Sequence, residues 1–505
     1  MKTLAWLLAF GSGFLSLSEE ILWVRLFGFV HHGVPQAFSL VLALYLLGIA
    51  LGAVWGKRLC ERYSALPLVA AATLVLAGAL DLALPWLLVQ LAGQVPLLQL
   101  LGMALALIAS SALKAVLFPV AHHLGSQVED ARLGRSLSRV YFMNIVGSTL
   151  GPLLTGFVLL DYLSLDDAYR WIGALCWLMA AGCLATGMRR RALALTAAAA
   201  ASLLSLAPGQ HRVIVAYASG AGDQPVKSVI SNRHGVLHTL EGGDKGDVVY
   251  GGNVYDGRTN LDLAINSNRI DRAYLLAALH PNPRRLLVIG MSTGAWLRVL
   301  SAIPSVEQID VVEINPGYLE LIHGIAPLAA MLDDPRIKVH VDDGRRWLKR
   351  HADNRYDLIV MNTTFHWRAY TTNLLSQQFL SMASEHLLPG GIMAFNTTGS
   401  PDAVRTASAV FAHTYRWSNF VYASNSDFRN RLAEPAAPAR LAAMKIDGRV
   451  LLPAEQARYG AAVQALLDQA FVDLAAVARQ TPRPLEVIDD DAMQTEFRYG
   501  KGLVF

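Results

Sequence analysis

The chain has 505 residues, of which 53% are hydrophobic and 16% are charged, and its formal net charge is +4. This composition is too apolar for an ordinary soluble protein, and the small charge gives no reason to expect a nucleic-acid partner. Long apolar runs fill 4–207, whereas the composition from His211 onward is that of a globular protein. We therefore predict a transmembrane helical domain over 1–207, a small β-strand subdomain over 211–265 and a third domain over 266–505.

The N-terminal half contains six apolar segments that are each long enough to cross the hydrocarbon core of a bilayer. A further segment, 192–207, is short and rich in alanine, and it is compatible with a weak span, an interfacial helix or a linker. The six predicted spans are 4–29, 36–56, 66–89, 97–121, 140–160 and 168–188.

Basic residues gather in the loops after the even-numbered spans, which places these loops and the N-terminus inside the cell. Six spans put the soluble half in the cytoplasm, whereas seven put it outside. We favour the cytoplasm, because the ligand inferred below is made there. The sequence thus predicts a multi-pass protein of the inner (cell) membrane, with the lipid bilayer as a partner. The basic residues are Lys57, Arg58, Arg62, Arg132, Arg135 and Arg189–Arg191.

Charged side chains within the apolar segments are costly in a bilayer. Glu19, Glu20 and Arg25 are compatible with a polar site inside the bundle, with an intramembrane ion pair or with an interfacial position. Lys114 and Asp81 can likewise pair or reach the interface. Small residues over 147–156 predict a face of close helix packing.

Residues 211–265 are predicted to form short strands joined by glycine turns. These strands are expected at 213–217, 227–230, 235–240 and 247–250. From 270 onward a helix leads to a break at 280–283, after which strands and helices alternate. This alternation predicts a Rossmann-like α/β fold with a parallel sheet. Its strands are expected at 286–289, 309–312, 337–341, 356–361 and 392–395, and its helices at 295–300, 317–328, 345–349 and 377–387.

Polar residues follow four of these strands, where the carboxyl ends of parallel strands share one edge. A glycine turn (290–294) follows the first strand, Glu313 ends the second, Asp342 and Asp343 follow the third, and Asn362 follows the fourth. An acid for ribose and an Asp-Gly pair for an adenine amino group fit adenosine without phosphates, because no P-loop lysine is present. S-adenosylmethionine or its decarboxylated form is the ligand that fits. The predicted binding residues are Gly290, Ser292, Thr293, Gly294, Glu313, Asp342, Asp343 and Gly344.

The three cysteines lie in or beside apolar segments and have no metal-ligand spacing, so we expect no metal cofactor.

These motifs resemble those of membrane-fused spermidine synthase-like (polyamine aminopropyltransferase-like) proteins. The resemblance implies a β subdomain followed by a Rossmann-like domain of the class I methyltransferase and spermidine synthase type. It also implies that Glu313 binds the ribose hydroxyls, that Asp343 lies near the adenine and that 256–258 lies in a loop over the ligand, and it leaves a homodimer open. It is carried by residues 20–25, 280–290, 311–314, 341–345, 356–359, 388–391 and 487–493.

Two departures from this family remove negative charge from the site of a cationic polyamine. Thr293 stands where the family has an aspartate for the aminopropyl amine, and Asn362 stands where an aspartate orients the attacking amine. Asn362 cannot take a proton. Close by, His366 and Arg368 add positive charge, and Arg368 can pair with a carboxylate, which only intact S-adenosylmethionine has, or can cap a helix or face solvent. Asn362, His366 and Arg368 are the predicted catalytic residues.

Three functions remain open from the sequence. The first is an enzyme that cleaves the bond between the sulfonium and the amino(carboxy)propyl group and releases methylthioadenosine, with transfer to an amine acceptor or by a lyase or lactone-forming reaction. Intramolecular chemistry tolerates the loss of a base best, since proximity supplies much of the rate. The second is a methyltransferase, and the third is a catalytically silent sensor of the nucleoside that gates the bundle.

Overall fold

The computed structural model describes residues 2–126, 133–185, 195–197, 199–200, 211–222, 224–362, 365–493 and 495–503. The chain forms two compact units. The first comprises Met1–Ala221, Ser231–Arg233 and Leu503–Phe505, and the second comprises Gly222–Ile230 and His234–Gly502.

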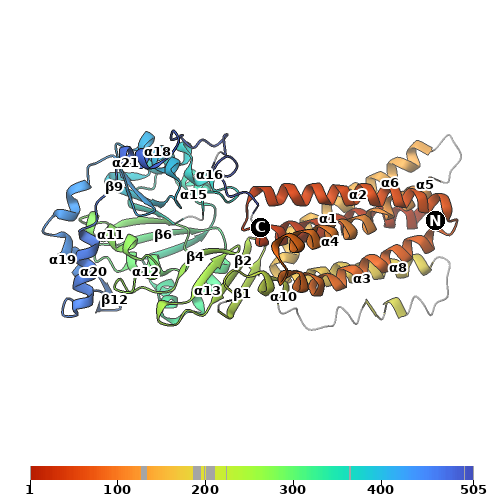
Figure 1. The fold of residues 1–505 in the computed structure, drawn as a ribbon, viewed down its shortest axis with the longest axis horizontal. Coiled ribbons are helices and arrows are strands. Elements are labelled where there is room, and N and C mark those ends of the chain that lie inside the picture. Colours follow the sequence, from red (N-terminus) through yellow and green to blue (C-terminus); the bar gives the residue numbers. More distant parts are fainter. Residues whose placement is uncertain are drawn as a thin grey trace. The chain divides into compact units, whose positions relative to one another are not determined.

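The first unit is a bundle of long helices (Figure 1). Among the described residues, five helices are long and apolar enough to cross a membrane: Lys2–Val30, Pro35–Arg62, Leu66–Ala92, Pro96–Gly125 and Leu137–Tyr162. The sixth predicted span corresponds to a helix that is not one of these five, Leu165–Ala185. The predicted seventh segment, 192–207, lies largely outside the described residues, as do Arg132 and Arg189–Arg191. The helices are α1 (Lys2–Val30), α2 (Pro35–Arg62), α3 (Leu66–Ala92), α4 (Pro96–Ala115), α5 (Leu117–Gly125), α6 (Leu133–Leu154), a π-helical turn (Thr155–Leu159), α7 (Leu160–Tyr162), α8 (Leu165–Ala185) and α10 (Arg212–Tyr217).

Three charged side chains meet in the interior of this bundle. Lys114 on α4 lies 2.7 Å from Glu19 on α1 and 2.8 Å from Asp81 on α3, and all three side chains are fully buried. The Trp23 indole also donates to Glu19, over 3.3 Å. Of the two arrangements considered for Lys114 and Asp81, pairing or an interfacial position, the structure has the pair. Of the three considered for Glu19, the structure has the ion pair.

Helices α1 and α6 approach each other so closely that glycine is required at their contact. A Cβ at Gly147 would lie 2.0 Å from the Phe10 carbonyl oxygen, and one at Gly151 would lie 2.5 Å from that of Phe14. On the facing helix, a Cβ at Gly13 would lie 2.4 Å from the Asn144 carbonyl oxygen. The prediction of a close packing face over 147–156 is therefore confirmed at Gly147 and Gly151.

The predicted strand at 213–217 is wrong, because Arg212–Tyr217 is helix α10. Its β-branched residues favour a strand in isolation, but tertiary contacts override that preference. The backbone N–H of Val213 donates to Asp166, and the Tyr217 hydroxyl donates to the Leu88 carbonyl. An acidic side chain at the first turn stabilises a helix terminus.

The second unit begins with a four-stranded sheet in the order β1-β2-β3-β4. Strand β4 was not predicted, and it joins β3 through a two-residue turn at Gly252 and Asn253, both at positive φ (57° and 67°). Such a turn suits the twist of a hairpin. The strands are β1 (Val226–Asn232), β2 (Gly235–Leu240), β3 (Val248–Gly251) and β4 (Val254–Arg258).

The main sheet has seven strands in the order β10-β11-β9-β8-β5-β6-β7. The five predicted strands pair in parallel, as expected, whereas β10 and β11 add an antiparallel hairpin that the sequence analysis missed. The strands are β5 (Arg285–Ile289), β6 (Gln308–Glu313), β7 (Ile337–Val341), β8 (Tyr356–Met361), β9 (Leu387–Asn396), β10 (His413–Trp417) and β11 (Phe420–Ser424). A separate two-stranded ribbon is formed by β12 (Lys445–Ile446) and β13 (Arg449–Val450).

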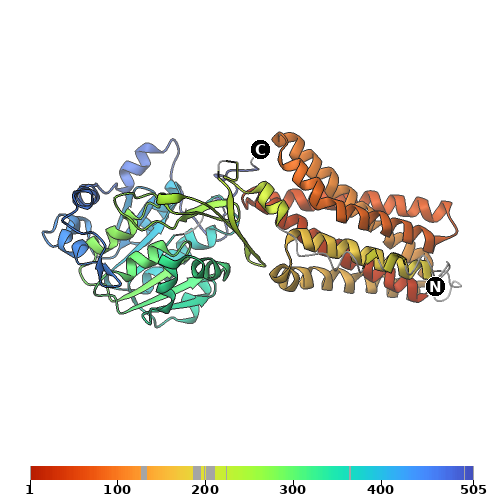
Figure 2. The same cartoon turned by 90° about the horizontal axis from the view of Figure 1, so that it is seen from below.

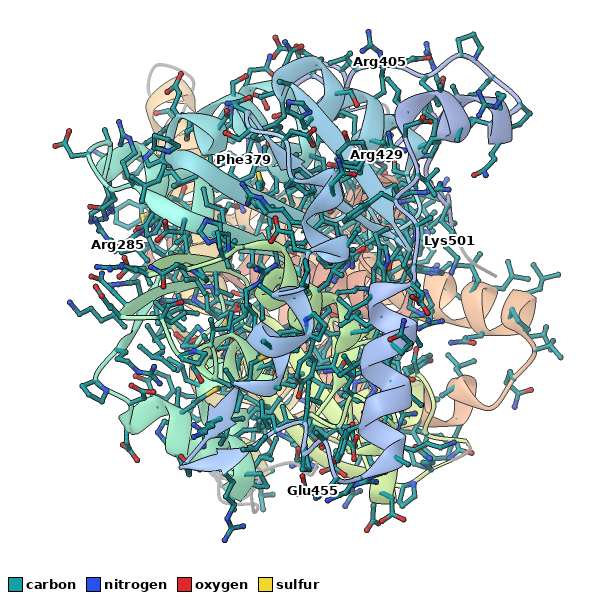
Figure 3. All side chains as sticks on the ribbon, turned by 90° about the vertical axis from the view of Figure 1, so that its left-hand side faces the viewer. Arg285, Phe379, Arg405, Arg429, Glu455 and Lys501 are labelled. Atoms are coloured by element: carbon teal, nitrogen blue, oxygen red, sulfur yellow. The ribbon has the colours of Figure 1, made fainter. Side chains whose placement is uncertain are left out.

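Helices cover both faces of this sheet, as the turned view shows (Figure 2). Alternate residues of each strand enter opposite cores, as Leu286 and Leu287 of β5 illustrate. In Figure 3, Phe379 on α17 lies in one of these cores, whereas Glu455 lies exposed at the surface. The predicted helix 317–328 is interrupted at Gly324, and the predicted helix 377–387 ends at Glu385. The helices are α11 (Asp271–Leu279), α12 (Ala295–Ser301), α13 (Gly317–His323), α14 (Ala326–Ala329), α15 (Gly344–Arg350), α16 (Thr372–Leu375), α17 (Gln377–Glu385), α18 (Pro401–Val410), α19 (Ala437–Ala442), α20 (Ala457–Leu467) and α21 (Leu474–Gln480).

Candidate active site

A cavity of about 370 Å³ opens at the carboxyl ends of the parallel strands of the second unit. It lies where the chain order reverses between β5 and its neighbours β6 and β8, the usual ligand position in open α/β sheets. Its volume is within the range of small-molecule sites. Of the predicted site residues, those that line the cavity are Gly290, Ser292, Glu313, Asp342, Asp343, Gly344, Asn362 and Arg368. Thr293, Gly294 and His366 are not among its described lining residues.

Glu313, the last residue of β6, forms the floor of this cavity. Its carboxylate accepts the backbone N–H groups of Met291 and Asn315, each over 2.8 Å, and it is buried. Burial raises the pKa of Glu313 to about 7. A carboxylate has about four lone-pair sites, so two backbone donors leave capacity for two hydroxyl donors from a ligand.

Asp342 and Asp343 follow β7 and have different partners. Asp342 forms ion pairs with Arg346 and Arg350. Asp343 caps helix α15, since its side chain accepts the backbone N–H of Arg346 over 2.8 Å. That capping bond uses one oxygen of Asp343 and leaves the other for a donor in the cavity, such as an exocyclic amino group.

The glycine turn is shaped by three residues at positive φ, namely Gly290 (82°), Ser292 (49°) and Gly294 (76°). A Cβ at Gly294 would lie 2.4 Å from the Met331 side chain, so this glycine permits close packing behind the turn. The Thr293 hydroxyl donates to the Arg258 carbonyl over 3.1 Å. Thr293 therefore links the glycine turn to β4. It stands at the position where the family resemblance leads us to expect an aspartate.

Asn362, at the end of β8, is oriented by its neighbours. The Asn396 side-chain amide donates to Asn362 Oδ1 over 3.1 Å, while Asn396 Oδ1 accepts the backbone N–H of Thr398. Asn362 thus has its N–H groups, which are donors only, available to the cavity that it lines. His366 instead contacts Thr398 Oγ1 through its backbone N–H (2.8 Å) and ring Nδ1 (3.0 Å), and burial lowers its pKa.

Two further charged groups meet at the β3–β4 turn, at the cavity wall. Asp256 on β4 accepts the hydroxyl of Tyr318 over 2.5 Å, and its backbone carbonyl accepts Ser292 Oγ over 2.6 Å. Burial raises the pKa of Asp256 to about 6. Arg368 Nη1 donates to the Gly251 carbonyl over 3.2 Å. Asp256, Tyr318, Ser292, Gly251 and Arg368 all line the cavity.

The C-terminal tail holds the loop that carries Arg368. The buried Glu496 carboxylate accepts the backbone N–H groups of Tyr370 (3.0 Å) and Thr372 (2.9 Å). Nearby, Arg345 makes two hydrogen bonds to Asp490, of 2.7 and 2.5 Å. One wall of the cavity therefore depends on residues more than a hundred positions later in the chain.

Sequence reasoning missed Tyr318 and did not include Asp256 among the site residues. Site residues at the ends of parallel strands could be predicted, because these ends share one edge of the sheet. Asp256 instead comes from an antiparallel hairpin, and Tyr318 comes from the first turn of α13. The available signal was the Gly251-Gly252-Asn253 turn, which ends three residues before the acid. Among the described residues, no group of three or more His, Cys, Asp or Glu side chains could hold a metal ion.

Comparison with known proteins finds similarity over part of the second unit. Residues 273–407 match the spermine/spermidine synthase domain. The chain is 37% identical over 125 residues to a polyamine aminopropyltransferase of Streptococcus pneumoniae, which covers 25% of this chain and 43% of that protein. It is 35% identical over 114 residues to spermidine synthase 1 of Datura stramonium (22% and 37%), and 26% identical over 295 residues to a polyamine aminopropyltransferase of Mycobacterium tuberculosis (55% and 54%).

The chain thus spans about half, or less, of the length of these curated relatives. Among solved structures, a spermidine synthase in complex with the transition-state analogue AdoDATO is 21% identical, with a TM-score of 0.36, over 41% of this chain and 76% of that chain. The match over 273–407 includes the glycine turn, Glu313, Asp343, Asn362 and Arg368. Residues 273–407, in the C-terminal part of the chain, are thus similar to the spermine/spermidine synthase domain.

Proposed function

We propose that the second unit binds a sulfonium nucleoside, S-adenosylmethionine or its decarboxylated form, and transfers the propyl chain on its sulfur to an acceptor. The observation that carries this proposal is the buried Glu313 carboxylate, which accepts a backbone N–H of the glycine turn and lines the same cavity as Asp343. Its remaining lone pairs suit the two ribose hydroxyls, and Asp343 suits the adenine amino group. The curated relatives are named for aminopropyl transfer, which supports the same reaction class.

In this reaction the nucleophile, an amine nitrogen, attacks the methylene carbon bonded to the sulfonium. The new C–N bond forms as the C–S bond breaks, its electron pair stays on sulfur to give neutral methylthioadenosine, and the amine loses one proton to solvent. Because the leaving group is a neutral thioether, no acid is required to expel it. Asn362 cannot act as a base, so the residues of this chain contribute chiefly by binding and orientation.

We also propose that the first unit spans the cell membrane, with the second unit in the cytoplasm. Its long helices expose large apolar side chains, among them Trp86 (64% exposed) and Leu105 (67%). Exposed apolar surface of this extent marks contact with lipid or protein. Five helices of sufficient length and hydropathy favour lipid.

The test is to incubate the purified full chain in detergent with S-adenosylmethionine, alone and with a diamine, then with the decarboxylated nucleoside and the diamine, and to identify the products by mass spectrometry. Methylthioadenosine from any of these mixtures supports the proposal, and the second product distinguishes amine transfer from lactone formation. S-adenosylhomocysteine and a methylated acceptor would mean that the domain transfers methyl groups. Binding without any product would identify a sensor.

A further inference from the structure

Opposite charges occur at one end of the cavity, on either side of the β3–β4 turn. Arg368 Nη1 bonds the Gly251 carbonyl, and a Cβ at Gly252 would lie only 2.5 Å from Arg368 Nη2. On the same turn, a Cβ at Gly251 would lie 2.4 Å from the Tyr318 hydroxyl and 3.7 Å from Asp256 Oδ2. The two glycines thus allow a guanidinium and a carboxylate to approach the same short piece of backbone.

We infer that Asp256 and Arg368 form a receptor for an α-amino acid group, so that the nucleoside bound here is intact S-adenosylmethionine, with its ammonium at Asp256 and its carboxylate at Arg368. This inference rests on the proposed function, because it names the substrate of the same cavity. It assigns the group that is transferred as amino(carboxy)propyl.

The charge balance distinguishes the two nucleosides. The decarboxylated form carries a sulfonium and an ammonium, and it would bring two positive charges to a cavity where the single Asp256 carboxylate already faces the Arg368 guanidinium. The intact form adds a carboxylate, which a guanidinium binds through paired N–H donors. Removing that carboxylate would leave Arg368 without its ligand partner and turn an attraction into a repulsion.

The surrounding residues agree with this assignment. Thr293 bonds the Arg258 carbonyl and carries no charge that could pair with an ammonium. Asp256, on the adjacent strand β4, lines the cavity and can supply that negative charge instead. Asn362 and Ser292 also line the cavity, and both are neutral. Burial raises the pKa of Asp256 to about 6, so the carboxylate is ionised at neutral pH and pairs with an ammonium.

A ligand series on the wild-type full chain tests the inference without any variant. Calorimetry would compare S-adenosylhomocysteine with two stable thioethers, one that lacks only the carboxylate and one that lacks only the ammonium. We expect each truncated thioether to bind at least tenfold more weakly, since each loses a charge-assisted contact. Equal or tighter binding of the thioether without a carboxylate would overturn the inference.

Variants assign the two charges to residues. Arg368→Gln should weaken the intact nucleoside at least tenfold and the decarboxylated one much less, Arg368→Lys should restore part of the loss, and Asp256→Asn should weaken both. Arg355→Gln, at a half-buried position directly before β8 and not among the cavity residues, is the matched control. If Arg368→Gln weakens both nucleosides equally, Arg368 only positions the loop and the inference fails.

The two proposals fail differently. Methylthioadenosine formed only from the decarboxylated nucleoside would refute the amino acid receptor while leaving sulfonium cleavage intact. Absence of both binding and methylthioadenosine with either nucleoside would refute the proposed function itself.

Discussion

At the scale of single residues, the burial of Glu313 makes the stability of the ligand-free protein depend on pH. Its pKa rises from 4.5 to about 7 in the folded state. The folded protein therefore holds a proton that the unfolded chain releases, and the associated stability, about 3 kcal/mol, is full below pH 4.5 and lost as pH rises through 7. Asp256, with its pKa near 6, contributes in the same direction.

We expect thermal unfolding of the full chain in detergent to occur at a lower temperature at pH 8 than at pH 5. In Glu313→Gln the amide does not titrate, so the difference between the two pH values should shrink. An unchanged difference in this variant would show that Glu313 ionises normally. The same variant should bind the nucleoside at least tenfold more weakly, because the amide offers one acceptor atom instead of two.

A negative charge introduced at Asn362 tests how the absence of a carboxylate at this position affects the use of a diamine acceptor. A carboxylate in Asn362→Asp can still accept the Asn396 amide, so the fold should tolerate the change. We expect kcat/KM for a diamine acceptor to rise about tenfold, the factor that 1.4 kcal/mol represents, because an anion attracts a diammonium. Steady-state kinetics with Asn362→Ala as control would check this, and equal values for both variants would argue against a charge effect.

At the scale of elements, the contact of α1 and α6 makes a matched pair of substitutions informative. In Gly13→Ala the new methyl group meets the Asn144 carbonyl at 2.4 Å, whereas at Gly28 of the same helix nothing lies within 4 Å. Gly13→Ala should destabilise the bundle by about 1–3 kcal/mol. Gly28→Ala should be neutral or slightly stabilising, because alanine favours the helix. Thermal unfolding in detergent measures both.

The loop and tail give a second prediction at this scale. Glu496→Ala removes both acceptors for the Tyr370 and Thr372 N–H groups, so the loop with Arg368 should lose its fixed position. We expect KM for the nucleoside to rise severalfold with a smaller change in kcat. Glu385→Ala, an exposed position on α17, serves as the control. Unchanged KM in Glu496→Ala would mean that the loop is held by its other contacts.

Elements with a strong internal pattern could be predicted from the sequence, and elements defined by contacts could not. The five parallel strands were predicted correctly because apolar runs, glycine turns and acids recur in order. Most of the residues predicted at their tips line the cavity, and their roles stay predictions. The prediction of a strand at 213–217 was wrong because the contacts that favour the helix are with Asp166 and Leu88, which are distant in sequence. The hairpin of β10 and β11 was not predicted, because an antiparallel pair does not follow from the alternation of strands and helices.

At the scale of the whole molecule, one cysteine reports the topology. Cys60, near the end of α2, is half-buried, whereas Cys176 and Cys183 are buried. In intact cells an impermeant maleimide should leave Cys60 unlabelled, and protease should spare the second unit. In inverted vesicles the maleimide should label Cys60 and the protease should cleave the second unit. If only Cys60 is labelled, or only the second unit is cleaved, in a given preparation, then Cys60 and the second unit lie on opposite sides of the membrane and the number of spans is odd.

The buried Glu19, Lys114 and Asp81 cluster also bears on biosynthesis. Ribosomes make α1 and α3, with their two acids, before α4 brings the lysine. In the proposed bilayer the first three helices therefore carry charges that lipid cannot neutralise, and they should remain beside the insertion machinery until α4 emerges. A chain that stops after α3 would expose both acids and become a substrate for membrane proteases. Lys114 therefore makes the pairing of both acids depend on the arrival of α4.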